Sequence, residues 1–191
     1  MGMDEKTLWD KKHGERSHSS LQPDPFLASA YGEFLFGTTP GFALDVAGGV
    51  GRHSIWLAQR GWRVKLMDIS EIGIQQAEEN ANRTGTAESI SKEIRDLNTM
   101  SDLGREQYDL VVVFFFLQRE LFPALLEAIK PGGTLTYKTY TTEQKNFPGG
   151  PSHPMFLLEP NELLRAFSSL RILHYHETLH EKGVAELVAR K

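Results

Sequence analysis

The stretch from Leu44 to Arg52, LDVAGGVGR, decides the fold. It joins an apolar run, Phe42 to Val46, which we predict to be a buried strand, to a helical pattern over Arg52 to Arg60 that Gly61 closes. Glycines in such a turn permit positive φ and a close approach of the backbone to a ligand, and the following helix offers unpaired N–H groups to an anion. A tight connection between strand and helix that binds no ligand would require the same glycines, so the glycines alone do not establish a binding site.

Outward from this turn, short apolar runs alternate with helical patterns. Further strands are predicted over Trp62 to Met67, Ser89 to Ile94, Leu110 to Phe115 and Thr134 to Tyr140, and further helices over Ser70 to Asn82 and Leu121 to Lys130. This alternation indicates right-handed crossovers and a parallel sheet with helices on both faces. The last two strand-like runs, Arg171 to Glu177 and Val184 to Arg190, are joined by a hairpin signal at Lys182-Gly183, so one strand should run antiparallel. We expect an open, doubly wound, mostly parallel α/β sheet with an antiparallel C-terminal strand.

The N-terminal segment is polar and has no hydrophobic period from Asp4 to Pro25, which predicts a loosely docked arm. Phe26 to Phe36 carries an apolar stripe typical of an amphipathic helix. We therefore expect residues 1–25 to form an arm or lid, with Trp9 facing the pocket, and residues 26–191 to form a single ligand-binding domain.

Composition narrows the function classes. The 191 residues are 40% hydrophobic and 24% charged, and none is cysteine, which excludes disulfides, thiolate metal sites and a cysteine nucleophile. The formal net charge of −4 argues against a nucleic-acid partner. The longest apolar run, Leu110 to Leu117, is far shorter than the roughly 20 residues that a membrane helix needs. No targeting segment is recognised, so we expect a cytoplasmic protein without a membrane partner; its oligomeric state cannot be read.

Two ligands compete for the glycine turn, a dinucleotide and S-adenosylmethionine. The dinucleotide fingerprint Gly-x-Gly-x-x-Gly fails, because Ser54 stands at its third glycine. The sequence instead reads Asp-x-Ala-x-Gly-x-Gly, with Asp45 inside the end of the strand. A carboxylate there would repel a pyrophosphate but can hold the ammonium group of an amino acid.

Two more acidic residues end the next two predicted strands. Asp68 is placed to accept both hydroxyls of a ribose, and Asp96 to accept from an adenine amino group while the backbone N–H of Leu97 meets the ring. Each Asp alone would usually be a loop or capping residue. The three together match an ammonium, a ribose diol and an adenine in order.

On these residues, the stretch from Ala43 to Tyr140 resembles the class I S-adenosylmethionine-dependent methyltransferases, with Ala47 in place of the more usual glycine. The C-terminal hairpin agrees with the antiparallel seventh strand of that Rossmann-like fold, which implies a seven-stranded sheet. The chain is also similar to the tellurite-resistance methyltransferase subgroup in the segments Trp9-Asp10, Gly51-Arg52, Phe115 to Arg119, Thr139-Tyr140 and Leu157 to Pro160.

The resemblance implies S-adenosylmethionine as methyl donor and a methyltransferase that moves a methyl group by in-line displacement to a small-molecule acceptor. The donor-binding residues it implies are Asp45, Ala47, Gly48, Gly49, Gly51, Arg52, Asp68, Ile69, Asp96, Leu97, Phe114 and Phe115. Arg119, Tyr140 and His153 are candidates for the acceptor side, and no catalytic base is assigned. We expect no metal, because His174 and His176 share a strand face but lack a third ligand. A non-catalytic binding module of the same fold and a nucleotide-dependent oxidoreductase are the alternatives.

Overall fold

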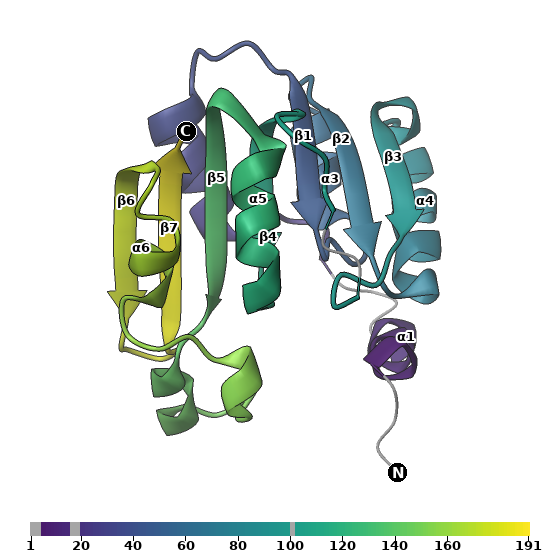
Figure 1. The fold of residues 1–191 in the computed structure, drawn as a ribbon. Coiled ribbons are helices and arrows are strands. Elements are labelled where there is room, and N and C mark those ends of the chain that lie inside the picture. The colour runs from purple at the N-terminus through teal and green to yellow at the C-terminus, as the bar shows by residue number, and fades with distance from the viewer. Residues whose placement is uncertain (1–4, 16–19, 100–101) are drawn as a thin grey trace. The chain divides into compact units, whose positions relative to one another are not determined.

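A computed structural model describes residues 5–15, 20–99 and 102–191. The chain forms two compact units, Met1–Met100 and Ser101–Lys191, each of which is described by itself. All seven strands belong to one mostly parallel sheet, which confirms the predicted fold class. Figure 1 shows the helices and strands along the chain.

The first unit contributes three parallel strands in the order β3-β2-β1. They are β1 (Phe42–Val46), β2 (Arg63–Asp68) and β3 (Ile90–Ile94), at the predicted places. The apolar side chains of β2 are buried, with Leu44 of β1 and Leu66 of β2 fully inaccessible to solvent, whereas Ile94 at the end of β3 is exposed. Because the strands are parallel, Val46 and Asp68 bring the ends of β1 and β2 to the same edge of the sheet.

Helix α3 (Arg52–Ala58) follows β1, helix α4 (Glu71–Thr84) follows β2, and the 3₁₀ turn η2 (Ala87–Ser89) precedes β3. The start of α4 is as predicted, since the Ser70 hydroxyl accepts a hydrogen bond of 3.0 Å from the Gly73 N–H. The helix ends at Gly85, in the left-handed conformation. α3 ends at Ala58 rather than Arg60, because the chain turns at Gly61, whose φ is 88°.

The N-terminal segment, for which the sequence predicted a loosely docked arm and no helix, contains the helix α1 (Glu5–Glu15). Ion pairs one turn apart, Lys6–Asp10 and Lys11–Glu15, stabilise it in place of an apolar stripe. Residues 1–4 and 16–19 of the predicted arm lie outside the described residues. α2 (Pro25–Ala30) and the π-helical turn η1 (Tyr31–Leu35) confirm the helix predicted over Phe26 to Phe36.

The second unit contributes four strands in the order β4-β5-β7-β6. They are β4 (Tyr108–Phe114), β5 (Ile129–Tyr140), β6 (Arg171–Thr178) and β7 (Val184–Arg190). β7 runs antiparallel to both neighbours, as the hairpin signal predicted, and its opposite direction is visible in Figure 1.

The helical elements of this unit are η3 (Arg119–Leu121), α5 (Phe122–Ala128), η4 (Thr142–Asn146), η5 (Pro154–Phe156) and α6 (Glu162–Ala166). α5 ends at Ala128 instead of Lys130, since the segment around Gly132 and Gly133 pairs with Lys191 and extends β5. The rings of Phe122, Tyr137 and Phe167 pack together in the core.

Candidate functional site

The glycine turn of the first unit has three residues in the left-handed region. Ala47, Gly49 and Gly51 have φ of 53°, 54° and 80°. At Gly48 the constraint is space, because a Cβ there would lie 2.8 Å from the Asp45 carboxyl carbon and 2.9 Å from Leu66. The turn is therefore specific for glycine at Gly48, Gly49 and Gly51, while Ala47 carries a side chain in a conformation that disfavours one.

Asp45 lies at the end of β1, fully buried beneath the turn. Its Oδ2 accepts hydrogen bonds from the N–H and the hydroxyl of Ser54, at 3.1 and 2.7 Å. Burial raises the pKa of Asp45 to about 7, although both bonds from Ser54 lower it. The residue that breaks the dinucleotide fingerprint is thus the partner of the carboxylate, and it fixes Asp45 against the first turn of α3.

Asp68, at the end of β2, joins the glycine turn to the start of α4. Its Oδ2 accepts from the Gly49 N–H and its Oδ1 from the Ser70 N–H, both at 2.8 Å. Burial raises the pKa of this carboxyl, against the hydrogen bonds from Ser70 and Gly49. Because each carboxylate oxygen has two lone pairs, each retains one acceptor position after these bonds are made.

Of the other predicted donor residues of this unit, Arg52 begins α3, and Ile69, Asp96 and Leu97 lie in loops after β2 and β3. Ile69 and Arg52 are half-buried, and Leu97 is buried. Asp96 lies beyond the end of β3, where its Oδ1 accepts from the Asn98 N–H at 2.9 Å. Hydrogen bonds therefore join Gly49 to Asp68 and Ser54 to Asp45, whereas Asp96 makes a local turn.

Sequence analysis missed the contribution of α1, which lies beyond the carboxyl ends of the first unit's strands (Figure 1). The Asp10 carboxylate accepts from the Ser70 hydroxyl at 2.6 Å and from the Ile72 N–H at 3.3 Å. Burial would raise the pKa of Asp10, but hydrogen bonds from Lys6, Ser70 and Ile72 lower it to about 2. Asp10 thus fastens α1 to the loop that follows Asp68.

His13, one turn further along α1, lies against the glycine turn. A Cβ placed on Gly49 would be 3.0 Å from its Cε1, and one on Gly73 would be 3.2 Å from its Cδ2. The His13 carbonyl also accepts from the Gln76 side chain at 3.1 Å. The only sequence signal for this contact was the Trp9-Asp10 pair, since no hydrophobic period marks the helix.

Phe114 and Phe115 end β4 in the second unit. Phe114 is buried, and Phe115 has a φ of 57°, in the left-handed region that a bulky side chain rarely adopts. The Phe115 N–H donates to the Lys138 carbonyl at 2.7 Å, and its ring lies 5.1 Å from that of Tyr140. Phe115 and Tyr140 therefore form an aromatic pair at the carboxyl ends of β4 and β5.

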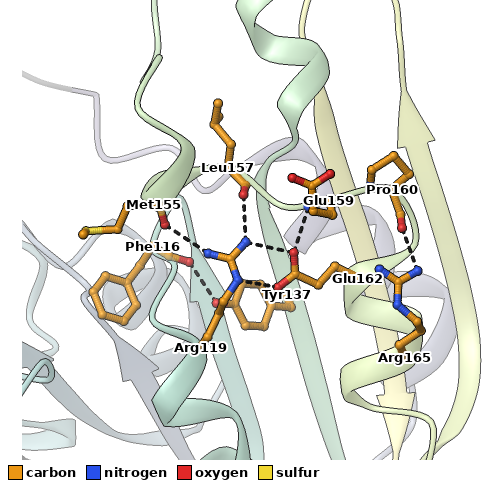
Figure 2. A network of polar contacts seen from close by, with 9 residues as sticks. All are labelled: Phe116, Arg119, Tyr137, Met155, Leu157, Glu159, Pro160, Glu162 and Arg165. Carbon is orange, nitrogen blue, oxygen red and sulfur yellow. Dashed lines mark hydrogen bonds and ion pairs between the residues drawn. The ribbon is translucent and has the colours of Figure 1, made fainter.

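The guanidinium group of Arg119 is hydrogen-bonded to other groups of the second unit, as Figure 2 shows. Its Nε donates to Glu162 at 2.6 Å, and its Nη2 donates to Glu162 and to the Leu157 carbonyl at 2.9 Å each. Its Nη1 donates to the Met155 carbonyl at 3.3 Å. His153 begins the same segment, with its Nδ1 accepting from the Met155 N–H at 3.3 Å. Arg119 and His153 thus both contact the backbone of the same segment, residues 153–157.

A comparison with models of known families identifies the family of the chain. The profile of the family described as tellurite resistance protein TehB matches residues 34–186. The chain belongs to the TehB family. A search of curated proteins finds no match.

Solved structures share the fold of this TehB family member. TehB from Haemophilus influenzae is 21% identical, with a TM-score of 0.73 over 96% of this chain and 67% of that one. A SAM-dependent methyltransferase from Aquifex aeolicus is 19% identical, with a TM-score of 0.69 over 99% of each chain. DhpI, in a complex described as DhpI-SAM-HEP, is 18% identical, with a TM-score of 0.67 over 100% of each chain. The fold is that of the S-adenosylmethionine-dependent methyltransferases, as the resemblance implied.

The described helices include none that combines the length and the apolar character needed to cross a membrane.

Proposed function

We propose that this TehB family member is an S-adenosylmethionine-dependent methyltransferase that acts on a small-molecule acceptor. The observation that carries the proposal is the buried Asp68 carboxylate, held at the end of β2 by the N–H groups of Gly49 and Ser70. A carboxylate fixed in this way, with an acceptor position left on each oxygen, fits a ribose diol. The family membership and the methyltransferase fold support the same conclusion.

The glycine turn and the acidic residues of the first unit support the binding of the donor. The left-handed turn at Gly49 and Gly51 has no side chain of its own to obstruct a ligand that approaches the backbone. We propose that this turn, with Ala47, Gly48 and Arg52, holds the methionine part, and that Asp45 supports it from beneath through Ser54. Ile69, Asp96 and Leu97 would contact the adenine, and Phe114 and Phe115 the region of the sulfonium.

The donor supplies an electrophilic methyl group. The protein then has to align the acceptor with that group and exclude water, and it needs a base only if the acceptor must lose a proton. We propose that α1, within the arm of residues 1–25, serves as the lid that excludes water. The hydrogen bonds of Asp10 and the position of His13 against Gly49 support this role.

Two measurements test the proposal. Calorimetric titration with S-adenosylmethionine should show binding, and purified protein should release S-adenosylhomocysteine in the presence of an acceptor panel. Asp68→Ala should weaken donor binding by about 1.5–3 kcal/mol, the value of hydrogen bonds to a charged group. Glu88→Ala, which removes an exposed carboxylate of the same unit, is the matched control and should bind as the wild type does.

The outcomes separate the alternatives. Donor binding without turnover of any acceptor would favour a binding module of this fold. Binding of a nicotinamide dinucleotide in place of S-adenosylmethionine would favour the oxidoreductase. Unchanged affinity in Asp68→Ala would remove Asp68 from the site.

A further inference from the structure

The ring of His13, on α1, lies beside the groups that hold the Asp68 carboxylate. It lies against Gly49 and Gly73, since a Cβ added to either glycine would be 3.0 or 3.2 Å from the nearest ring atom. Gly49 donates its N–H to Asp68 at 2.8 Å. Gly73 donates its N–H to the hydroxyl of Ser70, and the N–H of Ser70 donates to Asp68. The glycines that His13 contacts thus belong to the hydrogen-bond network around this carboxylate.

Contacts of α1 and α4 hold the His13 ring in this place. Asp10, one turn earlier on α1, accepts from the Ser70 hydroxyl at 2.6 Å. The His13 carbonyl accepts from the Gln76 side chain at 3.1 Å. The ring of Trp9 stacks on the His13 ring, with the two centroids 5.9 Å apart. The imidazole is therefore fixed on the side of α1 that faces the glycine turn.

His13 also acts on the charge of Asp68. Burial raises the pKa of the Asp68 carboxyl, whereas two backbone hydrogen bonds and the positive charge of His13 lower it. The carboxylate of Asp10 acts in the opposite sense and raises this pKa. An imidazole at this place therefore favours the charged form of Asp68, the form in which both oxygens accept hydrogen bonds.

A ribose diol held by Asp68 needs hydrogen-bond donors as well as acceptors. In doubly wound sheets, an acidic residue at the end of the second strand accepts from the ribose hydroxyl of a nucleotide. A hydroxyl that donates to a carboxylate keeps two lone pairs, which an ionised carboxylate cannot satisfy. An imidazole N–H can donate to them. The chemistry of His13 thus complements that of Asp68.

We propose that His13 is a second ribose-binding residue, which donates a hydrogen bond to the ribose that Asp68 holds. This inference rests on the proposed function, because it takes the donor to be S-adenosylmethionine with its ribose at Asp68. It gives α1 a part in recognising the donor, beyond the exclusion of water. All the groups that it invokes belong to the first unit.

The place of the ring is tested without any ligand. In NMR spectra of the full chain, the His13 Hε1 proton should show a nuclear Overhauser effect to Gly49 Hα, since the ring Cε1 lies 3.0 Å from the position of a Gly49 Cβ. The variant His13→Phe identifies the signal, because it lacks the imidazole. Absence of this effect in the wild type would overturn the inference, whatever the protein binds.

Calorimetric titration tests the contact with the ribose. The ligands are S-adenosylhomocysteine and its two analogues that each lack one ribose hydroxyl. His13→Ala and His13→Phe should each bind S-adenosylhomocysteine about five- to tenfold more weakly than the wild type, as expected for the loss of one hydrogen bond. For the analogue that lacks the hydroxyl contacted by His13, the affinities of variants and wild type should agree within about twofold. His13→Phe keeps an aromatic ring on α1, so its effect reports the hydrogen bond and not the loss of a ring.

The matched control is Lys11→Ala, which removes an exposed side chain of the same helix and should bind all three ligands as the wild type does. Equal weakening of all three ligands in the His13 variants would mean that His13 only packs α1, and it would overturn the inference. Unchanged affinity for S-adenosylhomocysteine would overturn it too, with the proposed function intact. If the wild type binds no S-adenosylhomocysteine, the proposed function itself fails, and the ribose contact fails with it.

Discussion

Asp45 shows at the scale of one residue how the site affects stability. Its carboxyl has a folded-state pKa of about 7, compared with an ordinary value of 3.8, because burial disfavours the charge. The folded protein therefore binds a proton more readily than the unfolded chain does. The stability that this provides is complete below about pH 4 and is lost as the pH rises through about 7.

From this we predict the behaviour of Asp45→Asn. Between pH 5 and pH 8 the free energy of unfolding of the variant should rise relative to that of the wild type by about 1–3 kcal/mol, because the amide is never charged. Urea unfolding at a series of pH values measures the difference. Glu88→Gln, which changes an exposed carboxylate of the same unit, is the matched control. A constant difference for Asp45→Asn would show that the buried carboxyl titrates as it does in the unfolded chain.

Ala47 gives a prediction about the backbone of the turn. Its φ of 53° is unfavourable for a residue with a Cβ and favourable for glycine. Ala47→Gly should therefore raise the free energy of unfolding by about 0.5–1 kcal/mol in thermal or urea unfolding. Ala28→Gly, at an exposed helical position in α2, should have the opposite effect, a loss of about 0.5–1 kcal/mol. Destabilisation by both would mean that the strain at Ala47 is absent.

At the scale of the element, α1 is held by few contacts. A helix of 11 residues is marginal by itself, and α1 buries no side chain completely. Asp10 contributes to its attachment by accepting hydrogen bonds from Ser70 and Ile72, beside the bond from Gln76 to the His13 carbonyl. Asp10→Ala should speed amide exchange in α1 about ten- to a hundredfold, as expected for the loss of charged hydrogen bonds.

The control for this prediction lies on the same helix. Lys11→Ala removes an exposed ion pair with Glu15 and should leave the exchange of α1 within about threefold of the wild type. Equal effects of the two variants would mean that Asp10 acts only on helix formation. Deletion of residues 1–20 tests the lid itself: turnover should be lost while the melting temperature is kept, and full turnover after deletion would exclude a lid.

The success of sequence analysis also varied by element. Strands β1 and β2 and the Ser70 cap follow from local signals, an unbroken apolar run or a serine three residues before the N–H that it accepts from. α1 has no such signal, since its stabilising contacts join Asp10 to Ser70 across the sequence. The Arg119–Glu162 pair was missed for the same reason, so the sequence placed Arg119 among the acceptor-side candidates without its carboxylate partner.

At the scale of the whole molecule, the donor should stabilise the fold. A ligand that binds only the folded state adds about 2.7 kcal/mol at a concentration of 100 times its dissociation constant. S-adenosylmethionine at that concentration should therefore shift the urea midpoint upward, and NADH at the same concentration should not. A millimolar concentration of S-adenosylmethionine that moves neither the midpoint nor the melting temperature would contradict the donor assignment.

The fold class and the identity of the turn were accessible from sequence because both depend on patterns contained in short stretches. The hydrogen-bond partners of the candidate residues could not be predicted from the sequence. Asp45 was expected to hold a ligand directly, yet its carboxylate is engaged with Ser54, a contact that depends on how α3 packs against β1. Tertiary packing determines which hydrogen-bond partner each of these side chains has, and the pattern of a single sequence does not contain that information.

Phe115 combines an unfavourable backbone conformation with a favourable ring contact. Its left-handed backbone would be relaxed by glycine, so selection for a more durable protein would favour losing the side chain. The ring, however, is half of the aromatic pair with Tyr140. The contact of the ring with Tyr140 therefore offsets part of the strain that the same side chain imposes on its backbone.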